Sequence, residues 1–105
     1  FLAYEYGRQM SRDQSKPMVL YFHSDVAAKC RQQAEILKVF NAGVYAGRLV
    51  LTDVNIRDFP QIAQQYGVFR APCWLFFNAG GQVVGRQYDI LSAEALQAGI
   101  SNLVR

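Results

Sequence analysis

The chain alternates between short segments rich in strand-favouring apolar residues and longer segments in which apolar residues recur at helical spacing. This pattern predicts four β-strands, at residues 17–22, 48–55, 73–77 and 82–87. It predicts helices at residues 1–13, 26–40, 61–65 and 93–103. The order α-β-α-β-α-β-β-α indicates an α/β fold class, with a central mixed four-stranded sheet and helices on both faces.

The three longer helices each have an expected buried stripe and an expected start. The stripes consist of Leu2, Tyr6 and Met10 in the first helix, of Ala34, Ile36, Leu37 and Phe40 in the second, and of Leu96, Ile100 and Leu103 in the last. Ser24 and Asp25 are candidate N-caps for the second helix, and Ser92 for the last, because short polar side chains accept hydrogen bonds from the first free N–H groups.

Residues 1–105 are expected to form one domain with two halves. An N-terminal helix within residues 1–14 precedes a βαβ half at residues 16–55, whose parallel strands need a crossover connection. Residues 59–104 add a short helix and a ββα half, in which the glycine-rich segment 78–81 is the hairpin turn.

Composition excludes several classes of protein. Half of the 105 residues are hydrophobic and 13% are aromatic, which is typical of an ordered globular domain. The net charge of +3 comes from dispersed Arg and Lys residues without a basic run, so nucleic-acid binding is not expected. No apolar segment is long enough to span a bilayer.

The chain contains two cysteines, Cys30 and Cys73. Two cysteines cannot form a disulfide framework, and even with His23 they supply too few ligands for a structural zinc site. We therefore expect no metal and no cofactor.

Cys30 lies at the point where an apolar strand gives way to a helix. The N-terminus of a helix stabilises an anion, and Lys29 and Arg31 beside Cys30 favour a thiolate. The alternative is an inert cysteine packed as a small hydrophobic residue. His23 is either an acid–base group near this thiol or a hydrogen-bonding loop residue.

Cys73 directly follows Pro72 at the start of a strand. Either Cys73 lies near enough to Cys30 to form a redox pair, or it is a buried strand residue; the Cα separation that decides this is not readable from sequence.

Several local motifs, in a fixed order, resemble the thioredoxin family of thiol–disulfide oxidoreductases. The resemblance covers roughly residues 16–103 and rests on Leu20-Tyr21-Phe22 with Cys30 eight residues later, on Asp53-Val54-Asn55-Ile56, on Tyr66-Gly67-Val68 leading to Ala71-Pro72, and on Phe77 before the glycine-containing turn. It implies the thioredoxin-like fold, in which a βαβ half joins a ββα half.

The resemblance also implies which residues occupy the family's functional positions. The attacking cysteine falls on Ala27 and the buried resolving cysteine on Cys30, so the motif reads Ala-x-x-Cys. The tryptophan before the motif falls on Val26. The family's buried acid falls on Tyr21, and the lysine often paired with that acid falls on Asp53. Asp53 is then either a polar partner of Tyr21 or an exposed acid at a strand end.

The resemblance also implies a groove that binds a peptide. A cis bond between Ala71 and Pro72 presents the Ala71 backbone to an extended peptide, and a groove glycine falls on Asp89. The expected binding residues are therefore Val26, Ala71, Pro72 and Asp89.

These assignments leave two functions open. Dithiol exchange needs one thiolate to attack and a second thiol to resolve the mixed disulfide, so Ala27 disables the normal cycle, whether as an engineered change or a natural one. The chain is then an oxidoreductase-family protein without normal dithiol activity. The alternative is a non-catalytic binding, adaptor or chaperone-like module, or a monothiol acting through Cys30.

The expected partner is a protein or peptide thiol or disulfide, or a bound protein segment, and the expected state is a monomer. The chain begins at Phe1 without an initiator Met, which favours a processed or trimmed form. The bacterial periplasm is the expected compartment, with the cytoplasm as the alternative.

Overall fold

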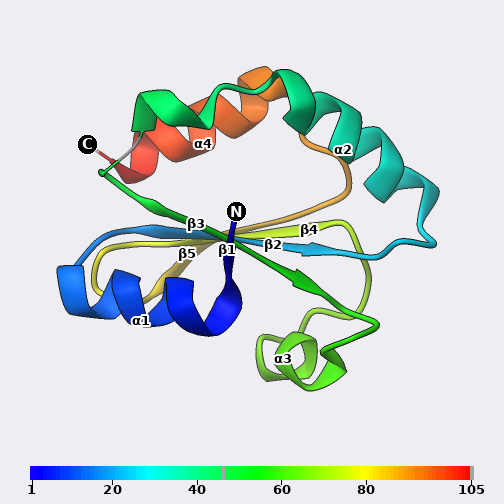
Figure 1. The fold of residues 1–105 in the computed structure, drawn as a ribbon, viewed down its shortest axis with the longest axis horizontal. Coiled ribbons are helices and arrows are strands. Elements are labelled where there is room, and N and C mark those ends of the chain that lie inside the picture. The colour runs from blue at the N-terminus through cyan, green and yellow to red at the C-terminus, as the bar shows by residue number, and fades with distance from the viewer. Residues whose placement is uncertain (46, 105) are drawn as a thin grey trace.

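The computed structural model describes residues 1–45 and 47–104 and contains one twisted sheet with helices on both faces (Figure 1). Its elements are β1 (Leu2–Ala3), α1 (Tyr4–Gln14), β2 (Met18–His23), α2 (Ala28–Val39), a 3-10 helix (Ala42–Tyr45), β3 (Val50–Asn55), α3 (Pro60–Gln65), β4 (Cys73–Phe77), β5 (Val83–Tyr88) and α4 (Ala93–Leu103). The α/β fold class predicted from the sequence is confirmed. The sheet has five strands where four were expected, because the two-residue β1 pairs with β3.

Strands β2 and β4 lie in the interior of the sheet, whose order is β1-β3-β2-β4-β5. β2 runs parallel to β3 and antiparallel to β4, and β4 runs antiparallel to β5. Every residue of β4 is buried, as are the first five residues of β2, because these two strands are covered on both faces. No helix among the described residues is long and apolar enough to cross a membrane.

The alternation of side chains along β2 and β4 divides the core between the two faces of the sheet. Leu20, Phe22 and Leu75 pack with Tyr4 of α1 and Ala63 of α3. On the other face, the core residues are Val19, Tyr21, Trp74 and Phe76, with Leu96 and Ile100 of α4. Figure 1 shows α1 and α3 below the sheet and α2 and α4 above it.

Of the predicted buried stripe of the first helix, Leu2 and Met10 are partly buried against the core, whereas Tyr6 is not. α1 begins at Tyr4, after β1, and buries Tyr4, Gly7 and Ser11, while the side chain of Tyr6 is 57% exposed. A Cβ atom on Gly7 would lie 2.9 Å from the Cβ of Thr52, so the smallest residue marks the line of contact with β3. The spacing of apolar residues does not predict this buried face, because glycine is not counted as an apolar residue.

The second helix starts later than predicted, and its predicted buried face is correct only for Leu37 and Phe40, which pack partly buried against the core. α2 has Ala27 as its N-cap, without a side-chain hydrogen bond, and buries Cys30 and Gln33, while Ala34 is exposed. Ile36, Leu37 and Phe40 are half-buried.

Gln33 explains the shift of this face, because its side-chain amide links α2 to the rest of the domain. Its oxygen accepts hydrogen bonds from Trp74 Nε1 (3.2 Å) and from the N–H of Leu91 (2.8 Å), and its nitrogen donates to the Leu91 carbonyl (2.9 Å). A buried glutamine is tolerated here because each polar atom of its amide has a partner.

Helix α4 matches its prediction closely. Ser92 is the N-cap, its hydroxyl accepts a hydrogen bond from Ala95 N–H at 3.1 Å, and Glu94 lies in the first turn. Leu96 and Ile100 are buried and Leu103 is half-buried.

Candidate functional site

The candidate site lies where β2 ends and α2 begins. Ser24 follows β2, and its backbone N–H donates to the Cys30 sulfur at 3.4 Å. The first turn of α2 carries Cys30, whose own N–H bonds to the carbonyl of Ala27 at 3.1 Å. Only 6% of Cys30 is exposed. The sulfur is therefore held inside the domain by the loop that precedes the helix.

Tyr21 lies beside this sulfur, on the same face of the sheet. Burial first, and then the adjacent Cys30 sulfur and the Asp53 carboxylate, raise the pKa of Tyr21 well above its usual value. Its ring stacks on Trp74, with centroids 4.3 Å apart. Tyr21 is therefore a neutral hydroxyl at physiological pH, and it does not replace the family's carboxylate in moving a proton.

The carboxylate of this region is paired with the only histidine in the chain. Nε2 of His23 lies 2.9 Å from Oδ2 of Asp53, across the parallel β2–β3 pair. Asp53 lies opposite Tyr21 in the strand pairing and its side chain is 36% exposed, but its hydrogen-bond partner is His23. The same contact supplies the His23 partner that sequence could not name.

Cys30, Tyr21, His23 and Asp53 share a cavity of about 490 Å³. Of the two cationic residues beside Cys30 in the sequence, Arg31 lines this cavity, whereas Lys29 forms an ion pair with Asp89. Among the described residues, no group of three His, Cys, Asp or Glu side chains lies close enough to hold a metal ion.

The expected groove residues Asp89 and Pro72 lie together. The Asp89 N–H donates to the Pro72 carbonyl at 3.0 Å, and the Ala71–Pro72 peptide bond is cis. The Lys29 ammonium lies 2.7 Å from the Asp89 carboxylate, which joins the start of α2 to the end of β5. This hydrogen bond, together with one from the Ile90 N–H, lowers the pKa of Asp89.

The remaining predicted groove residues are accessible to a ligand. Val26 is 67% exposed in the loop before α2, and Ala27 and Ala71 are half-buried. Neither the N–H nor the C=O of Ala71 bonds to another described residue. This peptide unit is free to pair with an added extended segment.

Three functional candidates beside the groove were missed from the sequence. Phe69 is 77% exposed, its ring centroid lies 5.0 Å from that of Tyr88, and the Arg70 guanidinium lies 4.5 Å from the Tyr88 centroid. The sequence contained one indication of these residues, since Phe69-Arg70 directly precedes Ala71-Pro72. A loop does not need an aromatic or a positively charged side chain to turn, so such residues in a loop indicate binding.

Cys73 does not join the site. Both cysteines are free, and Cys73 faces the layer of Tyr4, Phe22 and Ala63, while Cys30 comes from α2 on the opposite face (Figure 1). Neighbouring strand residues point to opposite faces, so Trp74 faces Tyr21 and Cys73 cannot. Burial raises the pKa of the Cys73 thiol. The possibility of a Cys30–Cys73 redox pair is thereby removed.

Comparison with known proteins gives a uniform result. A family model described as Thioredoxin matches residues 3–102. A thioredoxin of Alicyclobacillus acidocaldarius is 24% identical over 90 residues, which cover 86% of this chain and 84% of that protein. Thioredoxin 1 of Nostoc sp. is 29% identical over 76 residues, covering 72% of this chain and 70% of that protein.

A solved structure titled "Structure of a malarial protein" superposes with a TM-score of 0.73 at 20% identity. The match covers 86% of this chain and 99% of that one, and at this identity it supports the fold alone. The family match, by contrast, extends over nearly the whole sequence and includes both halves of the sheet. The chain belongs to the thioredoxin family.

Proposed function

We propose that this chain is a thioredoxin-family protein that does not carry out the dithiol–disulfide cycle and that uses the family's groove to hold an extended protein segment. The observation that carries the proposal is the placement of its two cysteines: Cys73 packs in the core layer of α1 and α3, whereas Cys30 lines a cavity with Tyr21, which belongs to the core on the other face. In the cycle, a thiolate attacks a substrate disulfide, and a second thiol displaces the bound sulfur to release the reduced product. Cys30 has no second thiol within its own layer.

The environment of Cys30 supports the same conclusion. Cys30 is 6% exposed and its sulfur receives a hydrogen bond from the Ser24 N–H, while the more accessible Ala27 has no sulfur. A buried thiol approaches a protein disulfide only if the Ser24–Ala27 loop moves. The usual resolving residue is present and the usual attacking residue is absent.

The groove keeps features that suit a bound segment. The free Ala71 peptide unit offers one donor and one acceptor for strand-like pairing. Val26, one residue before Ala27, and Phe69, two residues before Ala71, are exposed apolar side chains. Aromatic side chains contribute large contact areas at low entropic cost, so Phe69 is the strongest candidate anchor.

The loss of the cycle is tested by reduction of insulin disulfides with dithiothreitol. We expect the unaltered protein to leave the uncatalysed rate unchanged. Ala27→Cys places a second thiol in the first position of the motif, and we expect it to accelerate the reaction. Acceleration by the unaltered protein would refute the loss of the cycle, and no gain in Ala27→Cys would refute its derivation from a dithiol enzyme.

Groove binding is tested with a fluorescently labelled, S-carboxymethylated insulin B chain, which is extended and has no free thiol. We expect Phe69→Ser and Val26→Asp to weaken binding several-fold, measured by fluorescence anisotropy. Val44→Asp places the same charge at another exposed valine and is the matched control. Equal affinity in all four proteins, or no saturable binding by the unaltered protein, would refute groove binding.

The 490 Å³ cavity favours one second candidate, a monothiol function. In that case the Cys30 thiolate attacks glutathione disulfide, forms a protein–glutathione mixed disulfide and releases one glutathione thiolate. Mass spectrometry after incubation with glutathione disulfide would show one adduct, absent in Cys30→Ala. An unmodified folded protein would rule this function out.

A further inference from the structure

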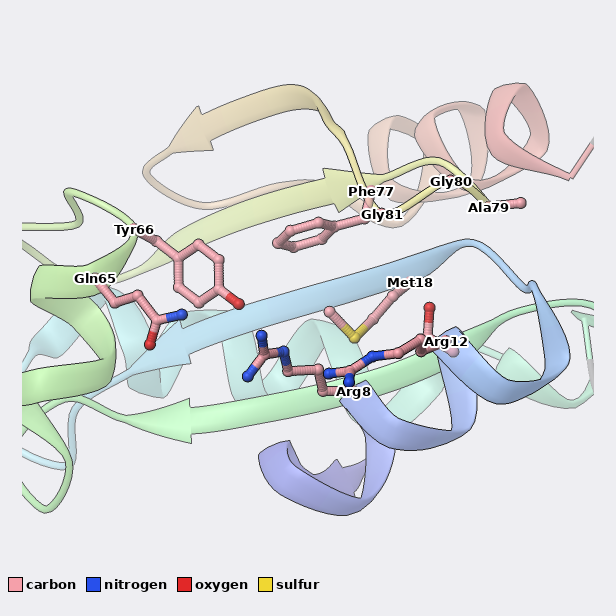
Figure 2. A pocket seen from close by; sticks show the side chains of 10 residues that line it. Arg8, Arg12, Met18, Gln65, Tyr66, Phe77, Ala79, Gly80 and Gly81 are labelled. Atoms are coloured by element: carbon pink, nitrogen blue, oxygen red, sulfur yellow. The ribbon is translucent and has the colours of Figure 1, made fainter.

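A second cavity lies at the opposite end of β2 from the candidate site. Its volume is about 610 Å³, and it lies between α1, the first residue of β2, the end of α3 and the β4–β5 turn (Figure 2). It shares no lining residue with the cavity beside Cys30. A ligand bound in this cavity would therefore not contact the cavity beside Cys30.

Two guanidinium groups face this cavity. Arg8 and Arg12 lie four residues apart on α1, and Figure 2 shows both side chains extending along the cavity. Like charges at this spacing destabilise a helix by a few tenths of a kcal/mol. Within the described part of the chain neither guanidinium forms an ion pair or a side-chain hydrogen bond, and no acidic residue lines the cavity. No ion pair among the described residues offsets this repulsion.

The opposite surfaces of the cavity are apolar and aromatic. Met18 and Phe77 are buried beneath it, and the Tyr66 ring contacts Phe77 edge-on with centroids 5.6 Å apart. Tyr66 is held in place by a hydrogen bond between its hydroxyl and that of Tyr4 at 2.5 Å. The Gly80–Gly81 part of the turn leaves the rim open, because it carries no side chains.

We propose that this cavity binds a small organic anion that carries a phosphate or carboxylate group next to an apolar or aromatic body. Arg8 and Arg12 pair with the anionic group, because the planar guanidinium matches both phosphate and carboxylate oxygens in a two-pronged geometry. Tyr66 and Phe77 contact the apolar body. The volume falls within the range typical of sites for small molecules.

Phenyl phosphate is the first probe, followed by benzoate, inorganic phosphate and benzyl alcohol, in titrations monitored by protein NMR. We expect phenyl phosphate or benzoate to bind more tightly than inorganic phosphate, and benzyl alcohol not to bind, because the site needs both charge and apolar contact. The first two probes distinguish phosphate from carboxylate recognition. Shifted resonances should belong to Tyr66, Phe77 and residues 79–81.

Arg8→Gln and Arg12→Gln test the two charges separately. Each should weaken binding about tenfold or more, in line with a lost charge-assisted hydrogen bond. Arg57→Gln removes an exposed charge outside this cavity and should change the affinity less than twofold. These surface changes leave the buried residues intact, so folding is checked by the unchanged spectrum.

Four results would overturn the proposal. The first is no saturable binding of any aromatic anion. The second is unchanged affinity in the Arg8→Gln, Arg12→Gln double variant, and the third is an equal loss in Arg57→Gln. Resonance shifts confined to His23 and Cys30 would also overturn it, because they would place the anion in the other cavity.

Discussion

The two ends of β2 differ in how their charged groups are partnered. At the His23 end, His23 pairs with Asp53 and Lys29 pairs with Asp89, and the Cys30 sulfur is buried. At the Met18 end, Arg8 and Arg12 line an open cavity without a carboxylate partner in the described structure. Both ends carry an arginine without an ion-pair partner among the described residues, Arg31 at the His23 end and the two on α1 at the Met18 end, but only the His23 end also contains ion pairs.

The two ends therefore carry different proposals, groove binding at the His23 end and anion binding at the Met18 end. A reactive thiolate needs exposure, and Cys30 is only 6% exposed. The Met18 end gains nothing in stability from two adjacent arginines.

The largest expected effect tests the attachment of α2, which carries Cys30. Gln33→Ala removes the partner of Trp74 Nε1 and of both backbone groups of Leu91, and we expect it to lower the free energy of unfolding by about 3 kcal/mol. Urea unfolding measures this change. Gln32→Ala alters the exposed neighbouring glutamine and should cost less than about 0.5 kcal/mol. Similar costs for both variants would contradict the role of Gln33.

A smaller effect tests the attachment of α1, which carries the two arginines. Gly7→Ala places a Cβ atom 2.9 Å from Thr52 and 3.2 Å from Val50, and the resulting shift of α1 should cost about 1–3 kcal/mol. Gly80→Ala adds a Cβ that meets only an ordinary contact at 3.4 Å and is the control. A stabilised Gly7→Ala variant, as helix propensity alone would give, would show that α1 does not pack as described.

Alkaline pH should destabilise the protein, because a buried thiol and a buried tyrosine hydroxyl lose their protons less readily in the folded state. Because burial raises the pKa of Cys73 and Tyr21 in the folded state, the unfolded chain loses these protons first as pH rises through about 8.5–10. The free energy of unfolding should therefore fall from pH 8 to pH 10 in urea titrations. Cys73→Ala should reduce the fall in the free energy of unfolding with pH, even though this variant is less stable than the unaltered protein at pH 7. An unchanged slope would show that Cys73 ionises equally in both states.

The smallest effect concerns the ion pair beside the groove. The pKa of Asp89 is lowered chiefly by the Lys29 hydrogen bond, so Lys29→Gln should move the Asp89 titration midpoint back toward its ordinary value. The carboxyl resonance followed by NMR measures this shift. Lys38→Gln breaks a different surface pair, with Glu35, and should leave Asp89 unchanged. Because the folded pKa is lowered, the pair contributes to stability above the usual carboxyl range and is lost as pH falls.

Sequence was sufficient for elements with strong local patterns. The apolar runs of β2 and β4, the Ser92 cap and the Leu96–Ile100 stripe follow directly from side-chain type and spacing. The residues that sequence misplaced are those whose role depends on a distant contact. Gly7 is buried because Thr52 lies against it, and Gln33 because Trp74 and Leu91 need its amide.

The candidate site shows the same limit. Resemblance pointed to Cys30, Pro72 and Asp89, but the His23–Asp53 pair depends on the register of two strands that lie far apart in the chain. The separation of Cys30 from Cys73 depends on which face of β4 carries Cys73. A one-residue change of register would reverse that face, so the motif alone could not decide it.

The most direct test of the central claim is a thiol titration of the folded and denatured protein after exposure to a mild oxidant, with mass analysis of the products. We expect two free thiols that react slowly until the protein is unfolded, because Cys30 and Cys73 are buried on opposite faces of the sheet. A reducible Cys30–Cys73 disulfide, or one thiol that reacts rapidly in the folded protein at neutral pH, would contradict the claim.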